Sequence, residues 1–198
     1  MRISKDPQVR KQEILDTAMR LFYEKGYEAT SMADIAKEMD VVKGLCYRYF
    51  DSKQTLFQEA MDQYVVLCCA GFIQILHRQD LTIQEKIDAV ATLMSEDKAQ
   101  YKYHDFFHKA GNEELHEQLT IRMCKMLAPH IIEEVKRLEK SEGIKIQDPE
   151  MLVHFLLFGQ VGMMFNVVKE ERTDPKELVA LLKRYAMAMI HNEILPAE

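Results

Sequence analysis

Glycine and proline are rare in this chain, and several of them stand where helical patterns begin or end. Only 7 glycines and 5 prolines occur in 198 residues. Since these two residues interrupt helices most strongly, a chain with so few of them can form long helices. We find no strand pattern, no repeat and no low-complexity segment. The sequence therefore predicts an all-α fold.

Apolar residues recur at steps of three and four along most of the chain, which is the spacing of one helix face. Pro149 and Pro175 suit the first turn of a helix, whereas Pro129 lies inside a long helical pattern and should kink that helix or mark its break. The nine expected helices cover residues 8–25, 31–39, 42–48, 52–77, 82–102, 103–110, 112–141, 148–169 and 173–193.

The first three expected helices are short and closely spaced. Ser31 and Asp34 have the spacing of a capping box at the start of the second helix. Asp40 and Val41 form a tight turn before the third helix, which ends near Phe50. Three short helices with a sharp turn between the second and third can place the third in the major groove of DNA. We therefore interpret this segment as a helix-turn-helix.

The same segment carries a family resemblance. The stretch ILDTAMRLFYEKGYEATSMADIAKEMDVVKGLCYRYFDSKQTLF resembles the N-terminal signature of the tetracycline-repressor-like (TetR/AcrR) family of transcriptional regulators. The resemblance covers roughly residues 10–57, about a quarter of the chain. The matching positions are Ile14, Leu15, Ala18, Leu21, Phe22, Gly26, Tyr27, Thr30, Ser31, Asp34, Ile35, Ala36, Val41, Lys43, Gly44, Tyr47, Tyr49, Phe50, Ser52, Lys53, Leu56 and Phe57.

The resemblance implies which residues contact DNA. They lie at the start of the second helix, along the third helix and at the start of the fourth, and comprise Thr30, Ser31, Lys43, Gly44, Tyr47, Arg48, Tyr49 and Lys53. Three of these residues also have a simpler structural explanation. Tyr47 also fits a core position, Lys53 a solvated surface charge, and Ser31 a helix cap alone. Phosphate contacts are compatible with all three alternatives.

Some positions depart from the family pattern. Asp40 stands where Gly is usual, and Asp tolerates such a turn. Val42 replaces a hydroxyl residue that caps the third helix, and Leu45 stands where Thr is common. Cys46 replaces a common core Leu, and we interpret it as a packing residue. Two hydroxyl contacts to DNA are therefore expected to be lost, with weaker binding or apolar contacts to thymine methyl groups in their place.

The charge is divided unevenly along the chain. The net charge is −6, but residues 1–53 contain 10 of the 26 basic and 9 of the 32 acidic side chains. The acidity therefore belongs to the remainder. We expect a DNA-binding domain at residues 1–53 and a helical ligand-binding and dimerisation domain at residues 54–198, the second implied by the resemblance.

Two apolar helices in the second domain are candidates for a dimer interface. Gly159 and Gly162 lower helix stability, and the close approach of another helix would compensate. The alternative is that both helices pack into their own core. The interface residues that we expect are Leu152, Phe155, Gly159, Gly162, Leu178, Leu182, Tyr185 and Met189.

A ligand pocket is harder to place. Aromatic and methionine side chains with a few polar groups suit a mixed apolar ligand, although each could equally be ordinary core. The candidates are Phe72, Met94, Tyr101, Tyr103, His104, Phe107, His108, Phe158 and Met163. His104 and His108 could share one helix face as metal ligands, but no further ligand completes the set. We therefore expect no metal and no cofactor.

Other classes of function lack support. The sequence has no glycine-rich phosphate loop, nucleophile elbow or HExxH motif, so an enzyme is not expected. A helical interaction protein that has lost DNA binding stays open, because the hydroxyl residues are missing. The hypothesis is a homodimeric repressor that binds palindromic double-stranded DNA and is released by a small-molecule inducer. The four cysteines show no metal spacing, and with no signal peptide or membrane span expected, we predict a cytoplasmic protein.

Overall fold

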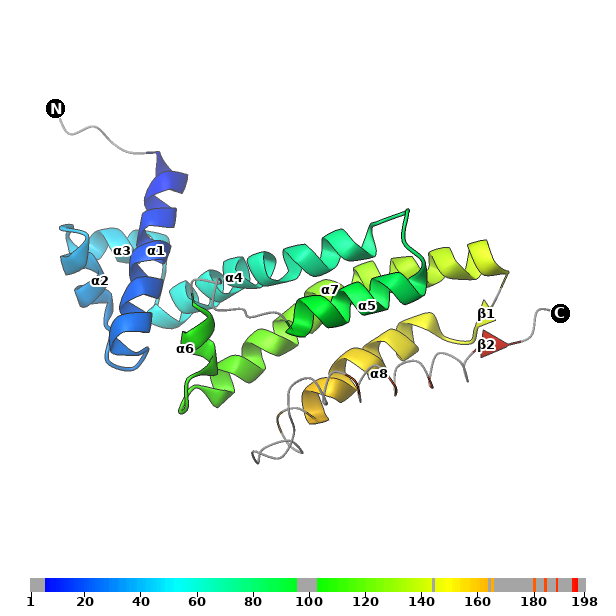
Figure 1. Cartoon of the computed structure of the whole chain (residues 1–198). Helices are drawn as coiled ribbons and strands as arrows, with labels where there is room; N and C mark the ends of the chain where they lie inside the picture. The colour runs from blue at the N-terminus through cyan, green and yellow to red at the C-terminus, as the bar shows by residue number, and fades with distance from the viewer. Residues whose placement is uncertain are drawn as a thin grey trace. The chain divides into compact units, whose positions relative to one another are not determined.

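The computed structural model describes residues 6–95, 103–143 and 145–163, together with residues 165, 180, 184, 188, 194 and 195. These residues contain eight α-helices and two short strands (Figure 1). In chain order the elements are α1 (Pro7–Lys25), α2 (Met32–Glu38), α3 (Lys43–Tyr49), α4 (Lys53–Leu76), α5 (Ile83–Ser95), α6 (His104–His108), α7 (Glu113–Glu142), β1 (Lys145–Ile146), α8 (Pro149–Gly162) and β2 (Ile194–Leu195). The all-α prediction is confirmed.

The chain divides into two compact units, Met1–Tyr64 and Val65–Glu198. Phe22 of α1 is fully buried in the first unit, where its ring meets Phe57 edge-on at 5.5 Å and Tyr27 at 5.2 Å. Phe57 belongs to α4, so the beginning of α4 supplies part of this core. The first unit accordingly extends to Tyr64, beyond the boundary expected at residue 53.

Both ends of α1 carry residues that terminate a helix. The Asp6 carboxylate accepts a hydrogen bond from the Gln8 N–H at 2.8 Å, and Pro7 occupies the first turn, where no N–H is needed. At the other end, Gly26 has a φ of 92°, and its N–H donates to the Phe22 carbonyl at 2.9 Å. Glycine adopts this positive φ without steric cost, so α1 ends at Lys25.

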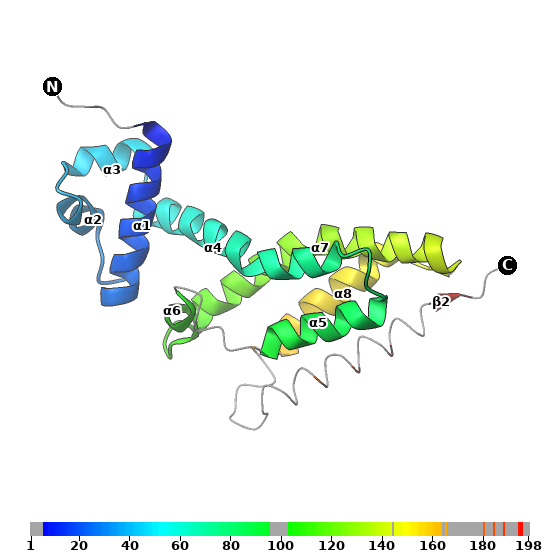
Figure 2. The same ribbon diagram turned by 45° about the horizontal axis from the view of Figure 1, so that its top comes forward.

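In the second unit, α7 and α8 lie side by side in both views (Figures 1 and 2). Cys124 and Ala128 of α7 pack against Val153, Leu157 and Val161 of α8. On both helices these positions recur every four residues, which places them on one face. The buried pair of faces forms the core of this unit.

A buried ionic group joins three helices of the second unit. Lys86 of α5 is only 1% exposed. Its Nζ donates to the Leu76 carbonyl of α4 at 2.7 Å and to the Glu134 carboxylate of α7 at 2.6 Å. Arg137 donates to both oxygens of the same carboxylate, at 2.6 and 2.8 Å. Burial of these charges is tolerated because each one is paired and hydrogen-bonded.

The structure adds a pair of strands to the sequence prediction, excludes one of the two alternatives for Pro129, and describes the last expected helix only in part. α7 runs through Pro129 from Glu113 to Glu142, so this proline does not mark a break. β1 and β2 form an antiparallel pair that was not expected, since two-residue strands are too short to show an alternating pattern. Of the expected helix 173–193, only residues 180, 184 and 188 are described, and all three are helical.

By length and composition alone, α4 could cross a membrane. Core helices pass the same test, and α4 contributes the buried Leu56, Phe57 and Met61 to the first unit. The expectation of no membrane span stays a prediction.

Candidate nucleic-acid interface

The segment from α2 to α3 has the geometry of a helix-turn-helix. The Ser31 hydroxyl accepts from the Asp34 N–H at 3.2 Å, while the Asp34 carboxylate accepts from the Ser31 N–H at 2.8 Å, so the expected capping box is present. Asp40 adopts a φ of 52° in the turn, the left-handed conformation that Asp tolerates better than most residues. The Val41 N–H then donates to the Ala36 carbonyl at 2.9 Å, which closes the turn.

One face of α3 is anchored in the core of the first unit. Cys46 is fully buried, and Phe50 directly after the helix is also buried. Burial raises the pKa of the Cys46 thiol, so the neutral form predominates and the side chain acts as a small apolar group. Val42 precedes the helix without a side-chain cap, as the loss of the usual hydroxyl predicts. α3 is therefore held by packing rather than by its N-terminal cap.

The opposite face of α3 is open to solvent. Val42 is 76% exposed and Tyr47 is 42% exposed, and Lys43, Gly44 and Arg48 are exposed beside them. The Lys43 ammonium lies 5.4 Å from the centre of the Tyr47 ring. Among the residues that the structure describes, neither Lys43 nor Arg48 forms an ion pair. This face therefore presents an aromatic ring between two uncompensated positive charges.

Several other cations of the first unit are paired with carboxylates. Arg20 of α1 donates to Glu38 of α2 at 2.6 Å and also contacts Glu24, and Lys11 contacts Glu59 of α4 at 2.5 Å. The hydrogen bond from Arg20 holds the pKa of Glu38 below its usual value. The Arg20–Glu38 and Lys11–Glu59 pairs connect helices within the unit. The sequence patterns gave no sign of these two pairs, because the partners lie on different helices.

Two of the expected phosphate-contacting residues are engaged inside the unit. Thr30 is only 1% exposed, and its hydroxyl donates to the Gly26 carbonyl at 2.9 Å. The Lys53 ammonium donates to the Tyr27 carbonyl at 2.8 Å and lies 4.2 Å from the centre of the Tyr27 ring. The burial of Thr30 does not support a phosphate contact through its side chain. Lys53 has a structural role as well as a charge.

The remaining expected DNA-contacting residues lie at the ends of helices. Ser31 is exposed at the start of α2, where its side chain already serves as the cap, and Tyr49 is half-buried at the end of α3. The helix-turn-helix thus brings Ser31 and the exposed residues of α3 into one short segment. Their contact with DNA stays a prediction.

The residues expected to line a ligand pocket are spread over several elements of the second unit. Phe72 lies on α4, Met94 on α5 and Phe158 on α8, and all three are half-buried. Phe158 packs against the core formed by α7 and α8. Phe107 of α6 is fully buried. Tyr101 lies outside the described residues.

The histidines near α6 stack on one another. The rings of His104 and His108 are nearly parallel with centroids 3.9 Å apart, and His116 of α7 follows 4.1 Å from His108. His116 also meets Phe165 edge-on at 4.9 Å. Burial, together with the nearby His108 and His104, lowers the pKa of His116 to about 4. Neither His116 nor Phe165 was among the expected pocket residues, although both contact this stack. Tyr103 precedes α6 and Met163 follows α8, both half-buried.

The expected dimer residues divide into inward and outward positions on α8. Leu152 is buried within its own unit, whereas Phe155 is 60% exposed. A Cβ placed on Gly159 or Gly162 would meet no atom of the described chain within 4 Å. Leu178, Leu182, Tyr185 and Met189 lie outside the described residues. α8 therefore has an exposed face that contains an aromatic ring and two glycines.

Comparison with known proteins agrees with this geometry. Residues 14–60 match the family model for bacterial regulatory proteins of the tetR family. A negative transcriptional regulator of the biofilm operon icaADBC, IcaR from Staphylococcus aureus (strain Newman), is 38% identical over 63 residues, which are 32% of this chain and 31% of that protein. The uncharacterised regulator YuxN from Bacillus subtilis (strain 168) is 45% identical over 51 residues, 26% of this chain and 18% of that protein.

The matches to these curated relatives span less than a third of their length. A solved structure extends the likeness to the whole fold: a TetR-family transcriptional regulator from Pectobacterium atrosepticum superimposes with a TM-score of 0.60 at 17% identity, covering 96% of this chain and 97% of that one. Within its N-terminal unit, this chain is therefore similar to the tetR family of bacterial regulatory proteins over residues 14–60, and its fold is similar to that of a solved member.

Proposed function

We propose that the chain is a DNA-binding transcriptional regulator, acting as a homodimeric repressor that a small-molecule inducer releases from a palindromic operator. The observation that carries the proposal is the exposed face of α3, with Lys43, Tyr47 and Arg48, on a helix whose other face is fixed in a core. A rigid helix with solvent-facing cations is what major-groove recognition requires.

The side chains on this face suit different parts of DNA. Lys43 and Arg48 can bind phosphates or the acceptor atoms of guanine, and the exposed Val42 can contact a thymine methyl group. Gly44 leaves the backbone of α3 open to close approach, because no side chain shields it. Thr30 supports the helices instead, and Lys53 does so in addition to its charge, which leaves α3 and Ser31 as the main contact surface.

The dimer is proposed from the exposed face of α8. Phe155 exposes a large apolar surface there, and Gly159 and Gly162 would allow a second helix to approach closely. A second copy of α8 is the occupant that we propose, since a two-fold dimer places two recognition helices on successive major grooves.

Control by an inducer is proposed for the second unit. A ligand shifts the equilibrium only if it binds one arrangement of the dimer more tightly than the other. The likeness to IcaR, a negative regulator, supports repression rather than activation. We propose no enzymatic activity, and we place the protein in the cytoplasm, where it would meet DNA.

Selection of bound duplexes from random DNA, at a stated salt concentration, tests the proposal. We expect an enriched palindrome for the parent chain and loss of enrichment for Lys43→Ala and Tyr47→Ala. Lys109→Ala is the matched control, because Lys109 is an exposed lysine of the second unit. Absence of any enriched sequence would favour a helical interaction protein, and turnover of a substrate panel would favour an enzyme.

A further inference from the structure

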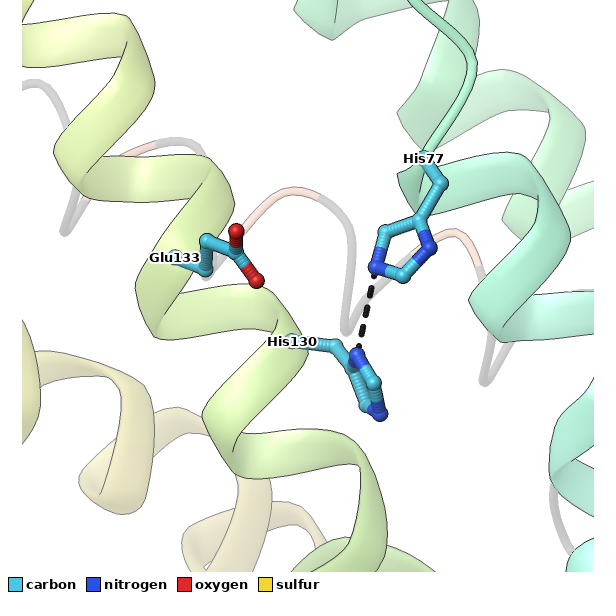
Figure 3. A group of neighbouring side chains, drawn as sticks. All are labelled: His77, His130 and Glu133. Carbon is cyan, nitrogen blue, oxygen red and sulfur yellow. Dashed lines mark hydrogen bonds between the residues drawn. The ribbon is translucent and has the colours of Figure 1, made fainter.

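Three potential metal ligands lie together between the end of α4 and the middle of α7. His77 follows α4, and His130 and Glu133 belong to α7 (Figure 3). One donor atom from each residue lies within 4.8 Å of the other two. His130 and Glu133 are three positions apart, which places them on one face of the helix.

The two imidazoles are spaced as metal ligands. His130 Nδ1 lies 3.2 Å from His77 Nε2. Two nitrogens bound to one tetrahedral zinc ion, each at about 2.0–2.1 Å, are separated by about 3.3 Å. A metal ion that replaced the shared proton of this histidine pair would therefore require little movement of either ring.

The Glu133 carboxylate can provide the third metal ligand beside the two histidines. Its side chain is exposed, and within the described part of the chain no hydrogen bond or ion pair engages it. Figure 3 shows its carboxylate on the side of α7 that faces His77. Rotation about its side-chain bonds can bring an oxygen to the same point as the two nitrogens.

The backbone that carries these ligands is fixed by a contact already described. The buried Lys86 ammonium binds the carbonyl of Leu76, the residue before His77, and the carboxylate of Glu134, the residue after Glu133. One buried side chain thus holds the neighbours of two ligands in place. A site whose ligands are positioned before the metal arrives loses less entropy on binding.

We propose that His77, His130 and Glu133 bind a divalent late transition metal ion, with Zn²⁺ as the ion to test. Two imidazoles and one carboxylate provide three of the four ligands of tetrahedral zinc and leave one position for water or another ligand. The bound ion would connect α4 to α7 within the second unit. This proposal does not depend on DNA binding.

Titration of the full chain with Zn²⁺, followed by competition with a chromophoric chelator, measures the affinity. We expect one ion per chain. His130→Gln and Glu133→Gln should each weaken binding at least roughly 10-fold, because loss of even an outer-shell partner weakens metal sites by that factor. His154→Gln removes an exposed histidine of α8 and should leave the affinity unchanged.

The Co²⁺-substituted protein distinguishes this site from others in the chain. We expect the d–d absorption of a four-coordinate ion without a thiolate-to-cobalt charge-transfer band. A charge-transfer band would place the ion on a cysteine and overturn the proposal, as would unchanged Zn²⁺ affinity in the His77→Gln, His130→Gln double variant. Circular dichroism confirms that each variant is folded, and Glu133→Gln changes only an exposed side chain.

Discussion

Mild acid should destabilise the second unit through His116. The ring of this residue is half-buried between His108 and Phe165. Burial, with a smaller effect of His108 and His104, lowers its pKa to about 4 from the ordinary value of 6.5. Above pH 6.5 the side chain is neutral in both the folded and the unfolded chain, so it contributes nothing to the pH dependence of stability. Between pH 6.5 and 4 the unfolded chain takes up a proton that the folded chain does not, so stability falls as the pH falls.

The pKa values set the size of the effect. One pKa unit corresponds to about 1.36 kcal/mol, so a drop in pKa from 6.5 to about 4 limits the loss to about 3 kcal/mol below pH 4. At pH 5 roughly 2 kcal/mol of this loss should already be present, by the same conversion. For a unit held by a net stability of roughly 5–15 kcal/mol, that is a measurable fraction.

Urea unfolding at pH 7 and pH 5, followed by circular dichroism, measures the loss of stability. His116→Gln removes the titrating group, so the decrease between the two pH values should become smaller than in the parent chain. His154→Gln, which removes an exposed histidine, is the matched control. The reasoning is refuted if the two variants lose the same amount of stability between pH 7 and pH 5.

Three further changes test other contacts. Ser31→Ala removes the cap of α2 and should lower the free energy of unfolding by about 1 kcal/mol, measured by urea denaturation; an unchanged value would mean that the capping box is not needed. Gly71→Leu should lower it by about 1–3 kcal/mol, because a Cβ at Gly71 already lies 3.1 Å from Leu93 Cδ2; equal or higher stability would contradict close packing of α4 and α5. Phe155→Glu should convert the proposed dimer to monomer in sedimentation velocity, with Lys145→Glu as an exposed control; a persistent dimer would exclude α8 from the interface.

The helix boundaries of the first unit could be predicted because their causes are local. Ser31 and Asp34 are three residues apart, and Gly26 directly follows α1, so the sequence itself displays the caps. Asp40 was expected in the turn for the same reason. Local patterns of this kind determine where a helix starts and stops, whatever it packs against.

The roles of individual side chains were less predictable. Thr30 was expected at a phosphate, but its environment is set by the end of α1, where the carbonyl of the capping residue Gly26 accepts a hydrogen bond from its hydroxyl. His77 and His130 are 53 positions apart and share no motif. Their meeting depends on how α4 and α7 pack, which periodicity does not reveal. Sequence patterns thus predicted the helices more reliably than they predicted the contacts between side chains.

The buried Lys86 also limits how the second unit can diverge through evolution. Loss of Lys86 alone would leave Arg137 as the only cation paired with the Glu134 carboxylate. Loss of Glu134 alone would leave the buried Lys86 ammonium without its carboxylate partner. Either single substitution would therefore give a less stable protein. Descendants of this chain are therefore expected to keep both residues or to exchange both together. Substitutions at positions 86 and 134 should thus be correlated, although 48 positions separate them.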